Sequence, residues 1–322
     1  MKIKRRLATV AAMSAAVPAT FPSVARALSR RKPTRLIVPF PPGGNADAIA
    51  RVFAEEMGKN TGAPVIVDNR AGASGTIGAE AVLRAEPDGN TLLLTVTSQL
   101  SSTAFNVQPS YDAKTDFVGI TGIVLTPLVV VAPASLGVKH IQEFVALAKT
   151  RPMAFGSYGA GTGTHILQAI FARQIGSDMV HVPYKGEAPV VTDLIAGEIQ
   201  MGMVAPGVAL QMSRAEKLQP LAVIGSARSE FLPRVPTFAE LGYKDLDWTY
   251  GVGLYASSKI ERPRLLELER LAQSVVNAER IRARYREQSN EPWGAKGEEL
   301  QKRLVVDSIL WQKTTAVYGK MG

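Results

Sequence analysis

Apolar and polar positions follow one another along this chain in blocks that predict strands, glycine-rich turns and helices. Three times an apolar run stops at a glycine cluster and a helix-like pattern begins, within 36–57, 65–85 and 153–175. This succession of strand, turn and helix predicts parallel sheets with right-handed crossovers. The first N–H groups of each helix lack an intrahelical partner, and the helix dipole favours an anion there. We therefore expect anion sites at these turns, built without cationic side chains.

The predicted elements fall into two α/β units with doubly wound sheets. Strands are expected at 36–40, 65–69, 91–97, 127–132, 153–157, 179–182, 201–205, 221–226 and 248–255. Helices are expected at 47–57, from the 72–78 turn to about 85, and at 141–149, 164–175, 189–196, 262–282 and 298–318. We place residues 34–125 and 226–322 in one lobe and 126–225 in the other, so the chain would pass between them near 125 and 225. Loops at the carboxyl ends of both sheets could then face one cleft.

The composition excludes several kinds of chemistry. The chain has 322 residues, of which 46% are apolar and none is cysteine, so disulfides, thiolate metal sites and cysteine nucleophiles are absent. The three histidines, His140, His165 and His181, do not have the spacing of metal ligands. We expect neither a metal nor a cofactor.

The N-terminus has the outline of a secretory signal peptide. Four basic residues within 2–6 precede an apolar stretch from Leu7 to about Phe21, and Ala25-Arg26-Ala27 fits the small-residue cleavage signal. Arg5-Arg6 leaves a twin-arginine signal open, and a basic tail is the alternative to a signal of either kind. Residues 1–27 hold five basic residues and no acid, so their removal lowers the formal charge from +9 to +4. A nucleic-acid partner is not indicated, and we expect an exported, periplasmic protein.

The first glycine cluster follows Phe40. Two prolines and two glycines fix this loop and expose the N–H groups of Gly43, Gly44 and Asn45; Asn45 can cap the next helix, and Asp47 lies in its first turn. A purely structural turn is the alternative to a ligand loop.

The second cluster, from Gly72 to Gly78, includes Ala73, Ser74, Gly75 and Thr76. Its spacing is compatible with dinucleotide binding, but the next strand ends in Thr97-Ser98-Gln99 and so lacks the acid that binds a ribose.

The third cluster is Gly159-Ala160-Gly161-Thr162-Gly163-Thr164-His165. Either threonine can cap the helix, and the dipole at the first turn is expected to lower the pKa of His165 and keep it neutral. This histidine serves either as a capping and packing residue or as a ligand contact. Ser157 does not form a nucleophile elbow, because position 155 is Phe rather than Gly.

A fourth segment follows His181. Asp193 lies on the short helix after it and either accepts hydrogen bonds from nearby backbone or faces the cleft. Ala205 ends a later strand and is a further candidate at the carboxyl edge of its sheet.

Six motifs occur in one order along the chain and carry a resemblance to a known family. They are PFPPGGxxDxxAR, VDNRxGAxGTIGAE, PDGxTLL, GSxGxGTxxH, HVPYKGxAPxxTDLxxG and LPxVPTFAELG. From about residue 34 onward the chain resembles the Bug family, the periplasmic solute receptors of tripartite tricarboxylate transporters. Ala71, Ser74 and Asn90 depart from the usual pattern, and Ser74 adds a hydroxyl near the site.

The resemblance implies a class II periplasmic-binding-protein fold, with two lobes, a ligand cleft and a hinge. It implies a monomeric receptor, not an enzyme, that binds a small carboxylate through backbone amides and hydroxyls and docks on membrane permease subunits. A periplasmic sensor subunit and an acid-metabolising enzyme are the alternatives. The candidate ligand-binding residues are Phe40, Gly43, Gly44, Asn45, Asp47, Ala73, Ser74, Gly75, Thr76, Thr97, Ser98, Ser157, Ala160, Gly161, Thr162, Gly163, Thr164, His165, Asp193 and Ala205.

Overall fold

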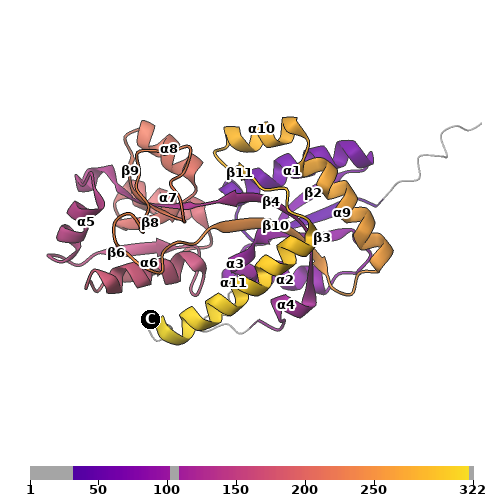
Figure 1. The fold of residues 1–322 in the computed structure, drawn as a ribbon, viewed down its shortest axis with the longest axis horizontal. Coiled ribbons are helices and arrows are strands. Elements are labelled where there is room, and N and C mark those ends of the chain that lie inside the picture. Colours follow the sequence, from indigo (N-terminus) through magenta and orange to yellow (C-terminus); the bar gives the residue numbers. More distant parts are fainter. Residues whose placement is uncertain (1–31, 102–108, 319–322) are drawn as a thin grey trace, which may run out of the picture. The chain divides into compact units, whose positions relative to one another are not determined.

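The computed structural model describes residues 32–101 and 109–318, shown as a ribbon in Figure 1. The strands are β1 (Thr34–Val38), β2 (Val65–Asn69), β3 (Thr91–Val96), β4 (Phe117–Thr126), β5 (Leu128–Pro133), β6 (Ala154–Ser157), β7 (Val180–Pro183), β8 (Met201–Val204), β9 (Leu218–Ile224), β10 (Tyr250–Ser257) and β11 (Glu291–Pro292). The expected signal peptide lies outside the described residues.

Helices cover both sheets. They are α1 (Asn45–Thr61), α2 (Thr76–Leu83), α3 (Thr97–Ser101), α4 (Ala113–Asp116), α5 (Ile141–Ala148), α6 (Gly163–Gln174), α7 (Glu187–Ala196), α8 (Pro206–Arg214), α9 (Arg262–Val276), α10 (Glu279–Glu287) and α11 (Gly297–Tyr318). Two short 3-10 turns, η2 (Ala73–Gly75) and η3 (Ala134–Leu136), complete the elements.

The strands form two mixed sheets, one in each α/β lobe. The six-stranded sheet has the order β11-β4-β10-β3-β1-β2, and the five-stranded sheet has the order β7-β6-β8-β5-β9. Strand β1 pairs in parallel with β2 and β3, and β6 pairs in parallel with β7 and β8, as the repeated strand-turn-helix pattern predicts. The carboxyl ends of these parallel strands lead into the helices whose N-termini form the site described below.

The remaining strands run antiparallel and change the expected picture. Strands β4 and β10 pair antiparallel with each other and β10 also with β3, while β5 lies antiparallel between β8 and β9. The sequence pattern did not predict β4 or α8, and the helix expected at 262–282 is two helices, α9 and α10, which break at Asn277. The chain leaves the first sheet at Pro127, between β4 and β5, and returns between β9 and β10.

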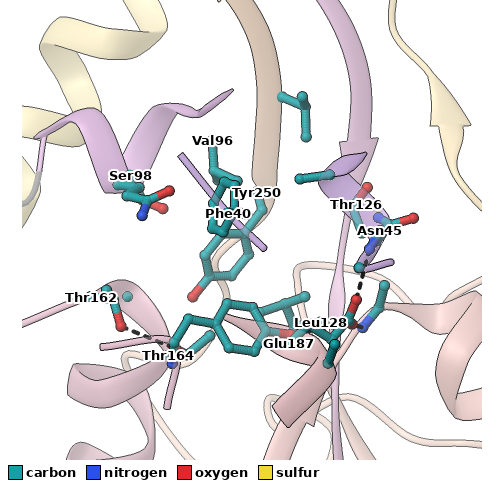
Figure 2. A pocket seen from close by; sticks show the side chains of 18 of the residues that line it. Phe40, Asn45, Val96, Ser98, Thr126, Leu128, Thr162, Thr164, Glu187 and Tyr250 are labelled. Carbon is teal, nitrogen blue, oxygen red and sulfur yellow. Dashed lines mark hydrogen bonds between the residues drawn. The ribbon is translucent and has the colours of Figure 1, made fainter. Parts of the chain in front are cut away.

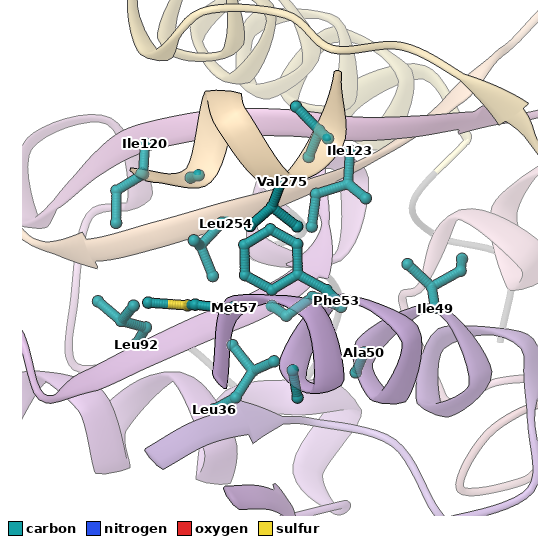
Figure 3. Packing of buried hydrophobic residues seen from close by; sticks show 14 of the residues in the cluster. Leu36, Ile49, Ala50, Phe53, Met57, Leu92, Ile120, Ile123, Leu254 and Val275 are labelled. Atoms are coloured by element: carbon teal, nitrogen blue, oxygen red, sulfur yellow. The ribbon is translucent and has the colours of Figure 1, made fainter. Parts of the chain in front are cut away.

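Helix α1 shows how the apolar pattern builds the first core. Its residues Ile49, Val52, Phe53 and Met57 recur at helical spacing, and all four are buried. Figure 3 shows Phe53 between the helix and side chains from other elements, among them Val275 of α9. These buried residues form one apolar face, which fixes the orientation of α1 against the sheet. The position of its N-terminus therefore depends on this packing more than on the preceding loop.

The second core surrounds α6. Nine of the twelve helix residues are buried, and Phe171 packs edge-on against Phe238 and Tyr243. The long C-terminal helix α11 reaches this core through Trp311, whose ring lies 4.2 Å from that of Trp248. Helix α11 also contacts β4 of the first sheet, so it packs against elements of both lobes.

We predict that Phe53→Ala destabilises the protein by about 3–5 kcal/mol, because it leaves a cavity in a fully buried position. The free energy of unfolding, measured by urea titration, checks this prediction. Val306→Ala on α11 is the control, since Val306 is 57% exposed and the change should stay within about 0.5 kcal/mol. A loss below about 1 kcal/mol for Phe53→Ala would contradict the packing described.

Candidate functional site

A cavity of about 70 Å³ lies where loops of the two lobes meet (Figure 2). Elements of the first sheet contribute Phe40, Pro41, Gly44, Asn45, Ala46, Val96, Ser98, Gln99, Thr126, Tyr250 and Val252. Elements of the second contribute Leu128, Tyr158, Thr162, Gly163, Thr164, Glu187, Ala188 and Ala205. No lysine or arginine is among these lining residues, so any anion held here must be stabilised by backbone and hydroxyl groups.

The N-terminus of α6 is open toward the cavity. Its N-cap residue Thr162 makes no capping bond with its side chain, because the Thr162 hydroxyl donates to the Gly159 carbonyl at 2.7 Å. The Thr164 hydroxyl accepts the Tyr158 N–H at 2.9 Å. Within the described residues, the backbone N–H groups of Gly163 and Thr164 have no hydrogen-bond partner. Two donors and the positive end of the helix dipole are therefore available to a ligand.

Tyr250 on β10 brings a third donor to the same place. Its side chain is 7% exposed, and its hydroxyl has no hydrogen-bond partner within the described residues. The hydroxyl points to the side of the cavity formed by Thr162 and Thr164 (Figure 2), and a Cβ at Gly163 would lie 2.7 Å from it. A side chain at position 163 would force the Tyr250 ring or the Trp311 ring to shift. Burial raises the pKa of Tyr250, so the hydroxyl remains protonated and can donate.

Glu187, the first residue of α7, places a carboxylate at the opposite side of the cavity. Its Oε2 accepts the Asn45 N–H at 3.0 Å, and its Oε1 accepts the Ala205 N–H at 2.6 Å. Asn45 begins α1 and Ala205 is the N-cap of α8, so one buried carboxylate binds the N-termini of two helices, one from each lobe. The Tyr158 hydroxyl lies 3.3 Å from Oε1, but its shorter bond goes to the Met203 carbonyl at 2.8 Å.

The charge state of Glu187 follows from this geometry. Burial raises its pKa, against the opposing effect of the bonds from Ala205, Asn45 and Tyr158. Both carboxyl oxygens accept an N–H group, an arrangement that suits the ionised form.

Asp47 lies in the first turn of α1, as expected, but its bonds are all internal. It accepts from the Gly43 N–H, the Asn69 amide and the Arg51 guanidinium at 2.9–3.0 Å. Burial raises its pKa, but these bonds outweigh that effect and hold the pKa below its ordinary value. Asp47 thus stabilises the loop that carries Gly44 and Asn45, and it is not among the residues that line the cavity.

The Asn45 side chain bonds to Asn290, which also accepts from Thr126 at 2.8 Å. Asn45 therefore does not cap α1 with its side chain, and the N-cap position belongs to Gly44.

The turn at 73–76 meets the loop that precedes α6. The Ser74 hydroxyl donates to the Ala160 carbonyl at 2.8 Å, which joins a loop of the first sheet to a loop of the second. Ala73 and Ser74 have φ values of 44° and 52°, in the left-handed region that non-glycine residues rarely adopt. Thr97, at the start of α3, bonds to Asp307 of α11 at 2.5 Å and is fully buried.

His165 and His181 lie at a second, more open cavity of about 740 Å³, lined also by Arg173 and Asp178. Their rings stack at 3.7 Å. Burial lowers the pKa of His165 to about 4, the direction that the sequence analysis expected from the dipole. Burial and the neighbouring His165 lower the pKa of His181 to about 3.

Two further candidates also lie outside the first cavity. The hydroxyl of Ser157 is 2.6 Å from His181 Nε2, so Ser157 belongs to the histidine pair. Asp193, which lies on α7, accepts a hydrogen bond from the Tyr184 hydroxyl at 2.6 Å.

The structure thus brings some of the twenty candidate residues to one cavity and distributes the rest around it. Phe40, Gly44, Asn45, Ser98, Thr162, Gly163, Thr164 and Ala205 line the cavity. The others are Gly43, Asp47, Ala73, Ser74, Gly75, Thr76, Thr97, Ser157, Ala160, Gly161, His165 and Asp193. Among the lining residues that sequence reasoning missed, Glu187 and Tyr250 matter most. The sequence could have indicated Glu187, because it follows a glycine within the motif HVPYKGxAP, at the position where the motif does not specify a residue.

Two features are absent from the described parts of the chain. Residues 32–101 and 109–318 contain no group of three or more metal-ligating side chains placed to hold an ion. None of the helices in these ranges has the length and apolar character needed to cross a membrane.

Comparison with solved structures defines the class of protein. The periplasmic binding protein BugD matches with a TM-score of 0.84 and 27% identity, over 89% of this chain and 97% of that chain. An R. palustris protein, Rpa4515, solved with adipate, matches with a TM-score of 0.83 and 26% identity, over 89% and 98% of the two chains. The two α/β lobes are those of periplasmic binding proteins.

Comparison of sequences gives the family. The model of the tripartite tricarboxylate transporter family receptor matches residues 49–317. A protein of the UPF0065 group from Pseudomonas sp. strain P51 is 31% identical over 293 residues, which are 89% of this chain and 86% of the relative. This chain therefore belongs to the tripartite tricarboxylate transporter receptor family, whose members are solute-binding receptors and not enzymes.

We predict that the NMR ring signals of His165 and His181 do not titrate between pH 8 and pH 5, because burial keeps both rings neutral. Unfolding frees both rings to take up protons below about pH 6.5. The stability that these two neutral rings contribute is therefore fully present above about pH 6.5, and it is lost as the pH falls toward about 4.

Thermal melts across this range check the linkage. His181→Phe keeps an aromatic ring in the stack and removes one titrating group, so its loss of stability on acidification should be smaller. Ring titrations centred near the ordinary histidine pKa would contradict the buried, neutral pair.

Proposed function

We propose that this protein is an extracytoplasmic receptor that binds a small carboxylate in the cavity between its lobes. One observation carries the proposal. The unpaired N–H groups of Gly163 and Thr164 and the unpaired, buried hydroxyl of Tyr250 face the same cavity. A buried donor without a partner costs stability unless a ligand supplies the acceptor. Three convergent donors of this kind suit the two oxygens of a carboxylate.

The helix dipole and the apolar walls add to this interaction. A carboxylate at the N-terminus of α6 meets the positive end of a 12-residue helix. Phe40, Val96, Leu128 and Val252 limit access of water, and a charge-assisted hydrogen bond is stronger where water is excluded. Hydrogen bonds to a charged group contribute about 1.5–3 kcal/mol each, so the site needs neither a metal nor a guanidinium group.

The proposal includes closure of two lobes about a hinge. One lobe would consist of residues 34–125 and 226–322, and the other of residues 126–225. The hinge would lie where the chain passes between the sheets, at Pro127 and between β9 and β10. Ligand groups that contact Tyr250 of one lobe and Gly163 of the other would favour the closed form. The same physics accounts for release once the lobes separate and water reaches the donors.

Transport is the role that the family supports. On this proposal the chain is exported through its cleaved N-terminal signal, acts as a monomer and delivers its ligand to membrane permease subunits. The relative solved with adipate supports a carboxylate ligand.

A panel of mono-, di- and tricarboxylates and aromatic acids tests the proposal by isothermal titration and thermal shift. We expect saturable binding of at least one acid and a rise in melting temperature. At a ligand concentration of 100 times the Kd, the stabilisation is about 2.7 kcal/mol. No heat and no shift across the whole panel would contradict the receptor function.

Tyr250→Phe tests the site itself. We predict about ten- to 150-fold weaker binding of the acid, equivalent to about 1.5–3 kcal/mol, because one donor to the carboxylate is lost. The unliganded variant should be as stable as the wild type or slightly more so, since an unpaired buried hydroxyl is removed.

Tyr285→Phe is the matched control. Tyr285 on α10 also has a buried hydroxyl without a partner in the described part of the chain, but it does not line the cavity. Equal loss of affinity in both variants, or no loss in Tyr250→Phe, would contradict the placement of the carboxylate.

A further inference from the structure

Helices α1, α6 and α8 begin at the cavity, and the chain's own carboxylate already binds the first amides of two of them. Asn45 at the start of α1 and Ala205 before α8 both donate to Glu187, while Gly163 and Thr164 of α6 remain free. The cavity therefore has two unlike ends. At one end lie the free amides of Gly163 and Thr164 and the free Tyr250 hydroxyl, and at the other lies the buried carboxylate of Glu187 (Figure 2).

A ligand carboxylate is unsuited to the end at Glu187. The Asn45 and Ala205 amides there already donate to Glu187, and the residues that line the cavity include no cation to offset two adjacent negative charges. An ionised carboxyl group has about four acceptor positions, and the backbone amides take only two. Glu187 can thus accept further hydrogen bonds from a ligand donor, and a cationic donor would also balance its buried charge.

The size of the cavity restricts the ligand further. A volume of 70 Å³ holds about five to seven water-sized groups, at roughly 10–15 Å³ for each. A chain of two or three carbons between the end groups fits this space, whereas a large aromatic acid or a tricarboxylate does not fit without opening of the lobes.

We propose that Glu187 is the specificity-determining residue of this cavity, and that the ligand is a short monocarboxylate with an ammonium group at its far end. The carboxylate contacts α6 and Tyr250, and the ammonium group contacts Glu187. This inference rests on the proposed receptor function and narrows the ligand from carboxylates in general to zwitterionic ones.

Three acids that differ only in one end group test the inference: β-alanine, 3-hydroxypropionate and succinate. They share the skeleton of one carboxylate and two methylene groups, and end in an ammonium, a hydroxyl and a second carboxylate. Isothermal titration at pH 7.5 should show β-alanine binding to the wild type at least tenfold more tightly than succinate, with 3-hydroxypropionate between them.

Two variants of Glu187 should reverse this order. Glu187→Gln removes the charge with little change of shape, and β-alanine should bind at least tenfold more weakly. Glu187→Ala frees the amides of Asn45 and Ala205, and succinate should bind at least tenfold more tightly than to the wild type. Glu198→Gln is the matched control, since Glu198 is exposed just beyond the same helix and should leave the three affinities unchanged. Far-ultraviolet circular dichroism confirms that each variant is folded.

The outcomes separate this inference from the function on which it rests. Equal binding of succinate and β-alanine by the wild type overturns the role of Glu187 and leaves the receptor function standing. If the ratio of the β-alanine and succinate affinities changes less than threefold in both Glu187 variants, the role of Glu187 is likewise overturned and the receptor function still stands. Absence of binding by any acid, in the wild type and in the folded variants, contradicts the receptor function and this inference together.

Discussion

A buried carboxylate that binds two helix N-termini is the interaction on which the site depends. One oxygen of Glu187 accepts the N–H of Asn45, which lies 142 positions earlier in the chain. Its other oxygen accepts the N–H of Ala205. The Ala205 amide would otherwise be a buried donor without a partner, which is costly, and the Asn45 amide would be a partly buried one. The same carboxylate sets the electrostatics of the cavity, because it consumes donors that an anionic ligand would use.

The fold brings these groups together through ordinary packing. The buried stripe of α1 orients that helix against the first sheet, and the apolar faces of α6 orient it against the second. Strand β1 of the first sheet and strands β6 and β8 of the second lead directly into α1, α6 and α8. The N-termini of these three helices therefore lie at the cavity. Helix α11 reaches the core of the second lobe through Trp311, whose ring lies close to Gly163. The helix termini are therefore held by the packing of the two cores, whose edge residues also line the cavity.

Local pattern predicted much of this arrangement, and long-range pairing decided the rest. The glycine cluster before α6 indicated an anion site at Gly163 and Thr164, and the structure leaves those amides free. Tyr250 was missed because the face it presents depends on β10 pairing antiparallel between β3 and β4, and β4 was not predicted. Asp47 was a candidate because the resemblance places the loop from Phe40 to Asp47 at the site, and in the structure it accepts hydrogen bonds from three donors of the chain itself. His165 lies against His181 of a neighbouring strand, a contact that spacing along the chain does not reveal.

A crystal structure with a bound acid tests the central claim most directly. The account predicts a ligand carboxylate within hydrogen-bond distance of the Gly163 and Thr164 amides and of the Tyr250 hydroxyl, with Glu187 still bonded to Asn45 and Ala205. A carboxylate on the amides of Asn45 and Ala205, with Glu187 displaced from them, would contradict it.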